Sequence, residues 1–257
     1  MSTSGPDDDR VVPEGGQSDP DNGGSISEED LVINFTGVSA RPREDRALDV
    51  LLETTRGVIP AILHACEGED GVVMFIAGGR ELKGPADGLY ERLATEFMDE
   101  GITSLRLGER RPGVFIESVG DVLAGLSFLK GIGAKRVVLV GHSFNGAVAI
   151  KAAEFSEMVV AVGALSAQTY GAQDVAQIAP RDLLIVHGMN DDVLSHEDAQ
   201  RIYDWAKEPK EIVLYPGANH GLREVKEPLY VKLKGWLMDR VGPPDGEAKN
   251  VSNEDVS

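Results

Sequence analysis

Short apolar runs, rich in β-branched residues, alternate with amphipathic stretches along most of this chain. The apolar runs are 71–79, 102–108, 135–142, 159–166, 181–188 and 210–217. The stretches with helical spacing are 84–101, 115–133, the residues that follow Ser143, 196–208 and 228–241. Strands without polar alternation are typical of a parallel sheet that helices cover on both faces. The pattern therefore predicts an α/β fold.

The first strands differ from the rest. Residues 47–68 predict two strands around the turn signal at 55–57, and a tight turn makes such a pair antiparallel. With these two, we expect a mostly parallel sheet of about eight strands.

Charge is concentrated at the two ends of the chain. The net charge of the 257 residues is −18, and residues 1–30 contain nine acidic side chains against one arginine. Residues 1–30 and 242–257 have the composition of disordered acidic tails, so we expect the folded domain to span 31–241. The part between the tails is also acidic, which argues against nucleic acid or an anionic membrane as a partner.

Three further features bear on location. The longest apolar run, 72–77, is too short to cross a membrane. Residues 1–10 have neither the basic nor the apolar region of a signal peptide. The single cysteine, Cys66, excludes an internal disulfide and suits a reducing compartment. We therefore expect a cytoplasmic protein.

Chemistry in parallel sheets lies in the loops beyond the carboxyl ends of the strands. Four predicted strand ends carry distinctive residues, at 78–80, 141–143, 187–192 and 217–220. We expect all four to face one crevice.

Ser143 stands at a strand-to-helix junction, in the sequence Gly-His-Ser-Phe-Asn-Gly at 141–146. A sharp turn there exposes the hydroxyl and strains the backbone, so its neighbours must be small. Such turns usually have glycine two residues after the serine, whereas this chain has Asn145. Asparagine tolerates unusual backbone angles and can bond locally at a helix start, which we expect to explain its presence.

A serine nucleophile needs a histidine base. His64 lies in an early strand and His187 at a strand end, where both are expected to pack. His142 adjoins Ser143 and is expected to point away from it, and His196 opens a helix without the second histidine of a zinc-binding H-E-x-x-H. His220, in a loop after the last strand, is the remaining candidate.

The base in turn needs a carboxylate to orient it. Asp191 and Asp192 both follow the preceding strand closely enough to serve. The spacing alone does not choose between them.

The segments GHSFNG, LLIVHGMNDDVL and YPGANHG together resemble the α/β-hydrolase family, over about residues 47–240. The resemblance implies an α/β-hydrolase fold and the chain order Ser143, Asp191 and His220 for the catalytic residues, with Asp191 from an H-G-x-x-D segment. It also implies an oxyanion hole made by the N–H of Phe144 and that of Gly79 or Arg80.

The strand at 159–166 is followed so soon by the next that no lid domain fits between them. The chain is therefore most similar to the lidless family members and resembles dienelactone hydrolases in outline, although those have cysteine where this chain has serine.

These observations predict a cofactor-independent serine hydrolase, without a metal, that acts on a small carboxylic ester or related acyl substrate through an acyl-enzyme. An acyltransferase, a thioesterase or peptidase with the same triad, and a non-catalytic binding protein on a hydrolase fold are the alternatives. The pattern specifies neither the acyl chain nor the oligomeric state.

Overall fold

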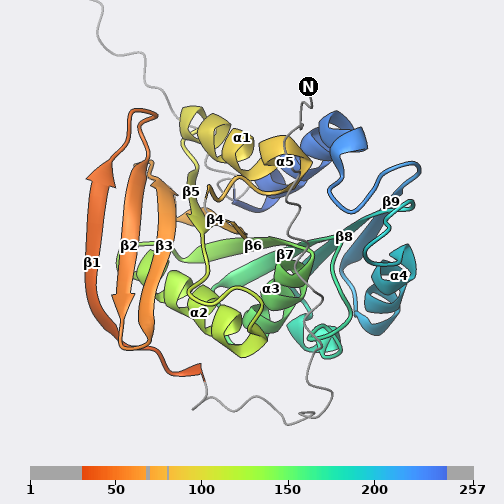
Figure 1. Cartoon of the computed structure of the whole chain (residues 1–257), viewed down its shortest axis with the longest axis horizontal. Coiled ribbons are helices and arrows are strands. Elements are labelled where there is room, and N and C mark those ends of the chain that lie inside the picture. The colour runs from red at the N-terminus through yellow and green to blue at the C-terminus, as the bar shows by residue number, and fades with distance from the viewer. Residues whose placement is uncertain (1–30, 68–69, 80, 242–257) are drawn as a thin grey trace, which may run out of the picture.

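A nine-stranded sheet runs through the computed structural model, which describes residues 31–67, 70–79 and 81–241 (Figure 1). The strands are β1(Phe35–Pro42), β2(Leu48–Thr54), β3(Gly57–His64), β4(Gly71–Ile76), β5(Thr103–Leu107), β6(Arg136–His142), β7(Val159–Leu165), β8(Asp182–Gly188) and β9(Lys210–Tyr215). Their order in the sheet is β1-β2-β3-β5-β4-β6-β7-β8-β9.

The direction of the strands divides the sheet in two. β1, β2 and β3 pair antiparallel with one another, and β3 pairs antiparallel with β5. From β5 to β9 every pair is parallel. The carboxyl ends of six strands therefore meet at one edge, and the predicted antiparallel pair within 47–68 is confirmed.

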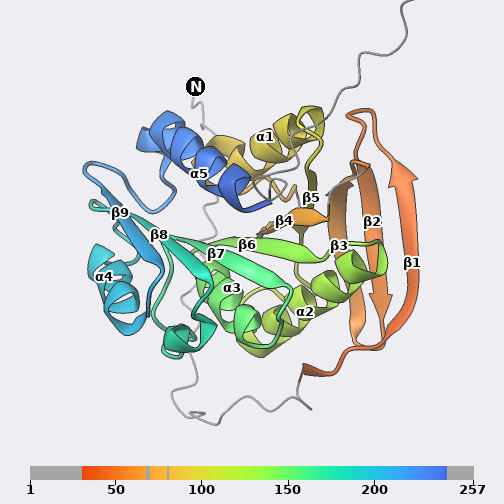
Figure 2. The ribbon, with the colours of Figure 1, turned by 180° about the vertical axis from the view of Figure 1, so that it is seen from behind.

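Five helices cover the two faces of the sheet (Figures 1 and 2). They are α1(Pro85–Asp99), α2(Phe115–Gly131), α3(Phe144–Glu154), α4(His196–Trp205) and α5(Lys226–Val241). α1 and α5 lie on one face, where Leu93, Phe97 and Trp236 belong to one buried apolar cluster with Phe75 of β4. α2, α3 and α4 lie on the other face over a second apolar cluster. The predicted α/β-hydrolase fold, with helices on both faces, is confirmed.

The sheet has nine strands where about eight were expected, and β1 is the strand that the sequence did not reveal. β1 is an edge strand, and seven of its eight residues are exposed. Its pairing with β2 is also irregular between Phe35 and Gly37. An exposed edge strand needs no alternation of apolar and polar residues, so the sequence of β1 contains no periodic signal.

The connection from β7 to β8, residues 166–181, contains a single short helix, η2(Val175–Ile178), and no lid domain. No helix of the described part of the chain is long and apolar enough to span a membrane. The acidic tails at 1–30 and 242–257 lie outside the described residues. Their disorder and the cytoplasmic location stay predictions.

The junction between β6 and α3 has an unusual backbone. Ser143 has φ 58° and ψ −125°, and its N–H donates to the Leu165 carbonyl at the end of β7 over 2.8 Å. The turn brings the backbone of Asn145 against Gly141. A Cβ on Gly141 would lie 1.9 Å from the carbonyl oxygen of Asn145 and 2.8 Å from the nitrogen of Gly146. Because these are backbone atoms, the turn has no room for any side chain at 141.

We predict that Gly141→Ala opens this turn and lowers the free energy of unfolding by about 1–3 kcal/mol, as overpacking does. Gly235→Ala is the control, because a Cβ on Gly235 of α5 meets no atom within 4 Å. Alanine is a better helix former than glycine, so this change raises the free energy of unfolding by about 0.5–1 kcal/mol. Urea unfolding of both variants measures the two effects, and equal stability of the two would contradict the tight turn.

A buried histidine–arginine pair lies beneath α1. The fully buried Arg106 of β5 donates from Nε to Nε2 of His64 over 3.2 Å, and its Nη1 lies 3.3 Å from the Leu82 carbonyl and 3.4 Å from a Glu91 oxygen. His64 therefore accepts at Nε2 and is neutral. Burial, followed by the charge of Arg106, lowers the pKa of His64 to about 4.

We predict that this histidine makes stability depend on pH. The unfolded chain binds the His64 proton below about pH 6.5, whereas the folded chain resists it until about pH 4. The contribution of His64 to the free energy of unfolding is therefore complete above its pKa in the unfolded chain. It is lost as the pH falls toward its pKa in the folded chain. His64→Gln keeps an acceptor for Arg106 without titrating. As the pH falls from about 7 to about 4.5, the free energy of unfolding of the native protein therefore decreases by on the order of 2 kcal/mol relative to that of this variant. Urea unfolding at the two pH values measures the difference. If the difference in the free energy of unfolding between the native protein and the variant does not change with pH, His64 is not the group responsible.

Candidate active site

The carboxyl ends of the parallel strands bring polar residues together from distant parts of the chain. Gly78 follows β4, Glu109 follows β5, Ser143 follows β6, Asp191 follows β8 and His220 follows β9. Since these strands are parallel, the five residues share one edge of the sheet, as the sequence predicted for four strand ends.

Ser143, His220 and Asp191 form a chain of hydrogen bonds at this edge. The Oγ of Ser143 lies 2.9 Å from Nε2 of His220, and Nδ1 of His220 lies 2.7 Å from Oδ2 of Asp191. The Asp191 side chain is fully buried, while that of His220 is 18% exposed. Asp192, the other candidate acid, is exposed. The arrangement places a hydroxyl, an imidazole and a carboxylate in the order that proton transfer from the hydroxyl requires.

Several donors surround the carboxylate of Asp191. Its Oδ1 accepts the N–H groups of Val193 and Leu194 at 2.8 and 2.9 Å. Burial acts to raise the pKa of Asp191, but these N–H groups and His220 outweigh it and hold the pKa below its ordinary value. Asp191 is therefore an anion at neutral pH.

Two further histidines support the site, and the sequence analysis gave neither of them a role in it. Nε2 of His187 lies 3.1 Å from Oδ2 of Asp191 and 3.2 Å from the Leu194 carbonyl, to which it donates. Nε2 of His142 donates to the backbone carbonyl of His220 over 2.7 Å. We expected His142 to point away from Ser143, yet it lines the same cavity. Burial lowers the pKa of His142 to about 4, so it stays neutral and holds the His220 loop.

The residues predicted for an oxyanion hole lie in two places. Phe144 begins α3 directly after Ser143, and the first N–H groups of a helix have no partner within it. Gly79 is exposed, with φ 80°, in the loop after β4, while its neighbour Gly78 lines the cavity with Ser143. Arg80 lies outside the described residues.

Asn145 behaves differently from our expectation. It lies in the first turn of α3 with ordinary helical angles, so the strained backbone belongs to Ser143 alone, and no side chain caps this helix. The buried amide of Asn145 instead bonds the carboxyl group of Glu109, which also accepts the Ser118 hydroxyl over 2.7 Å. The partner is 36 positions away in the sequence, so no local pattern could reveal it.

A cavity of about 590 Å³ opens over Ser143. Its walls include residues 84–87, Glu109 and Gly113. The connection 167–180 does not line it, although Tyr170 of that segment packs edge-on against Phe115, 5.5 Å between ring centres. Among the described residues, no group of three or more His, Cys, Asp or Glu side chains could hold a metal ion.

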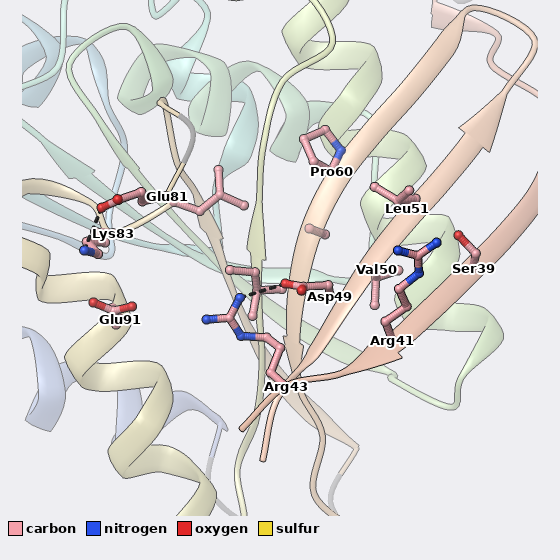
Figure 3. Close-up of a pocket in the computed structure, with 13 residues that line it drawn as sticks. Ser39, Arg41, Arg43, Asp49, Val50, Leu51, Pro60, Glu81, Lys83 and Glu91 are labelled. Atoms are coloured by element: carbon pink, nitrogen blue, oxygen red, sulfur yellow. Dashed lines mark hydrogen bonds and ion pairs between the residues drawn. The ribbon is translucent and has the colours of Figure 1, made fainter. Parts of the chain in front are cut away.

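A second hollow of about 610 Å³ lies between the outer face of β1–β3 and the loop before α1 (Figure 3). Its charged side chains largely neutralise one another: Arg43 pairs with Asp49 at 2.8 Å and Lys83 with Glu81 at 2.6 Å (Figure 3). Ser143 does not line it. We therefore take the cavity over Ser143 as the candidate active site.

Comparison with solved structures places this fold among the α/β hydrolases. Est1E from Butyrivibrio proteoclasticus superposes with a TM-score of 0.63 at 15% identity, covering 81% of this chain and 100% of its own. The dienelactone hydrolase from Anabaena variabilis ATCC 29413 superposes with a TM-score of 0.64 at 16% identity, covering 76% of this chain and 98% of its own. At such identities the likeness concerns the fold.

Sequence comparison adds the family. YfhR of Escherichia coli (strain K12) is 28% identical over 107 residues, which are 39% of this chain and only 36% of YfhR. The model of the dienelactone hydrolase family matches residues 89–236, which include β6, β8 and the residues 143, 191 and 220. The chain belongs to the dienelactone hydrolase family.

Proposed function

We propose that this protein is a hydrolase and, more specifically, a serine esterase, in which Ser143 is the nucleophile, His220 the general base and Asp191 the residue that orients the histidine. The observation that supports this most strongly is the pair of contacts at His220, 2.9 Å to the Ser143 hydroxyl and 2.7 Å to the Asp191 carboxylate. The proposed substrate is a small carboxylic ester.

In the first half of the proposed reaction, Ser143 Oγ attacks the ester carbonyl while its proton passes to Nε2 of His220. The anionic Asp191 stabilises the resulting imidazolium. Collapse of the tetrahedral intermediate breaks the bond to the alcohol oxygen, which takes the proton from His220 as the alcohol leaves. The acyl group is then esterified to Ser143.

The second half repeats these steps with water. His220 accepts a proton from the water that attacks the acyl-enzyme, and returns it to Ser143 Oγ as the carboxylic acid departs. The N–H of Phe144 is the first proposed donor to the oxyanion, because it opens α3 beside the nucleophile. The second donor is an N–H of the loop after β4, at Gly79 or Arg80.

We predict that Ser143→Ala lowers kcat by about 10⁶-fold on a nitrophenyl ester, because the covalent step is lost. A fluorophosphonate probe is expected to label Ser143 in the native protein and nothing in the variant, as mass spectrometry of the labelled peptide shows. Label on another serine, or unchanged turnover in the variant, would contradict the assignment. Labelling without turnover of esters, thioesters or amides would favour a binding protein, and turnover that requires an added alcohol would favour an acyltransferase.

The two adjacent aspartates provide a matched pair. Asp191→Asn is expected to lower kcat by about 10⁴-fold, because the amide holds His220 in the wrong tautomer. Asp192→Asn removes the same charge one position later from an exposed side chain and is expected to change kcat less than about threefold. If Asp192→Asn has the larger effect on kcat, the role assigned to Asp191 is wrong.

A further inference from the structure

Glu109 lines the cavity that contains Ser143, together with one other carboxyl group, that of Asp87 at the rim. Glu109 follows β5, and it is held by two donors, the buried hydroxyl of Ser118 at 2.7 Å and the buried amide of Asn145. A Cβ built on Gly78 would lie 3.9 Å from Oε2 of Glu109, so this oxygen approaches the loop after β4. The triad does not use this carboxyl group.

The strand order fixes the side of Ser143 on which Glu109 lies. β5 and β4 come before β6 in the sheet, whereas β8 and β9 come after it. Glu109 and His220 are therefore on opposite sides of the nucleophile. The leaving alcohol must receive its proton from His220, so it departs on the side of β9. The cavity over Ser143 is lined by residues that follow β4 and β5 and by none that follow β7 or β8, so it gives the acyl chain room on the side of Glu109.

No described cation neutralises Glu109. Its neighbour Arg110 is directed elsewhere, to Asp121 and, at 2.8 Å, to Glu117. At the rim of the cavity the cation Arg223 is engaged by Asp87 at 3.2 Å. Within the described residues, Glu109 forms no ion pair of 4 Å or less.

Glu109 retains acceptor capacity toward the cavity. An ionised carboxylate has about four lone-pair sites, and Ser118 and Asn145 occupy two of them. Burial raises the pKa of Glu109, while the bonds from Ser118 and Asn145 act to lower it. A substrate group that donates a hydrogen bond can occupy a free acceptor site of the Glu109 carboxylate. A carboxylate on the substrate would be repelled by it.

We propose that Glu109 is a specificity-determining residue that binds a hydroxyl or ammonium group on the acyl chain of the substrate and disfavours a carboxylate there. This inference rests on the proposed esterase function, because it needs Ser143 as the nucleophile and His220 on the leaving-group side.

The test uses four ethyl esters that differ only at the end of the acyl chain: ethyl 3-aminopropanoate, ethyl 3-hydroxypropanoate, ethyl butanoate and monoethyl succinate. Each competes with nitrophenyl acetate at about pH 7.5, and its inhibition constant is measured whether or not it is turned over. In the native protein we expect the ammonium ester to bind at least about tenfold more tightly than monoethyl succinate, because it gains one charge-assisted hydrogen bond to Glu109. The hydroxyl ester is expected to be the second tightest of the four.

Glu109→Gln removes the charge and keeps the size of the side chain, and it is expected to bring the four constants within about threefold of one another. Glu53→Gln, the control, removes an exposed charge on β2, which β3 separates from β5, and should preserve the native order. Glu109→Asp keeps the charge and is expected to preserve the order with smaller ratios.

The outcomes separate the two proposals. Absence of both nitrophenyl acetate turnover and fluorophosphonate labelling in the native protein overturns the esterase function itself. Turnover with no preference for the ammonium ester, or with a preference for monoethyl succinate, overturns the role of Glu109 alone, even if Glu109→Gln does not fold. A native preference that survives in a folded Glu109→Gln variant also overturns it.

Discussion

The contact between Gly141 and the backbone of Asn145 and Gly146 is the constraint on which the rest of the site depends. It allows the chain to turn from β6 into α3 within one residue, and it forces Ser143 to φ 58°. The strand and the helix are each packed on buried apolar residues, so the turn between them cannot relax. The hydroxyl is thereby held at 2.9 Å from His220 before any substrate arrives.

Backbone strain gathers at the same edge of the sheet. Apart from Arg46, the non-glycine residues with positive φ in the described chain belong to loops at this edge or to the start of α1: Leu82, Ala86, Asp87, Ser143, Ser166 and Leu222. The loops are also tied to one another, because the N–H of Ala86 donates to the carbonyl of Gly221 over 2.9 Å. A rigid parallel sheet can support such conformations, which are costly in isolation.

The two carboxyl groups of the site have opposite surroundings. Asp191 accepts two backbone N–H groups and the Nδ1–H of His220, which hold its pKa low and keep it charged. Glu109 is held only by an amide and a hydroxyl, and burial raises its pKa. The first arrangement suits an acid that orients a base, and the second suits a group that accepts a further hydrogen bond from a substrate.

The sequence by itself determined the parallel sheet and the strand ends from which Ser143, Asp191 and His220 project, because apolar periodicity reports burial and parallel strands place their carboxyl ends at one edge. It did not reveal β1, whose exposed residues have no periodicity. The role of Asn145 was also not predicted, because its partner Glu109 follows β5, which is distant from Asn145 in the sequence. Only the tertiary structure decided such contacts, because they depend on which strands are neighbours in the sheet, and that order is not the order of the chain.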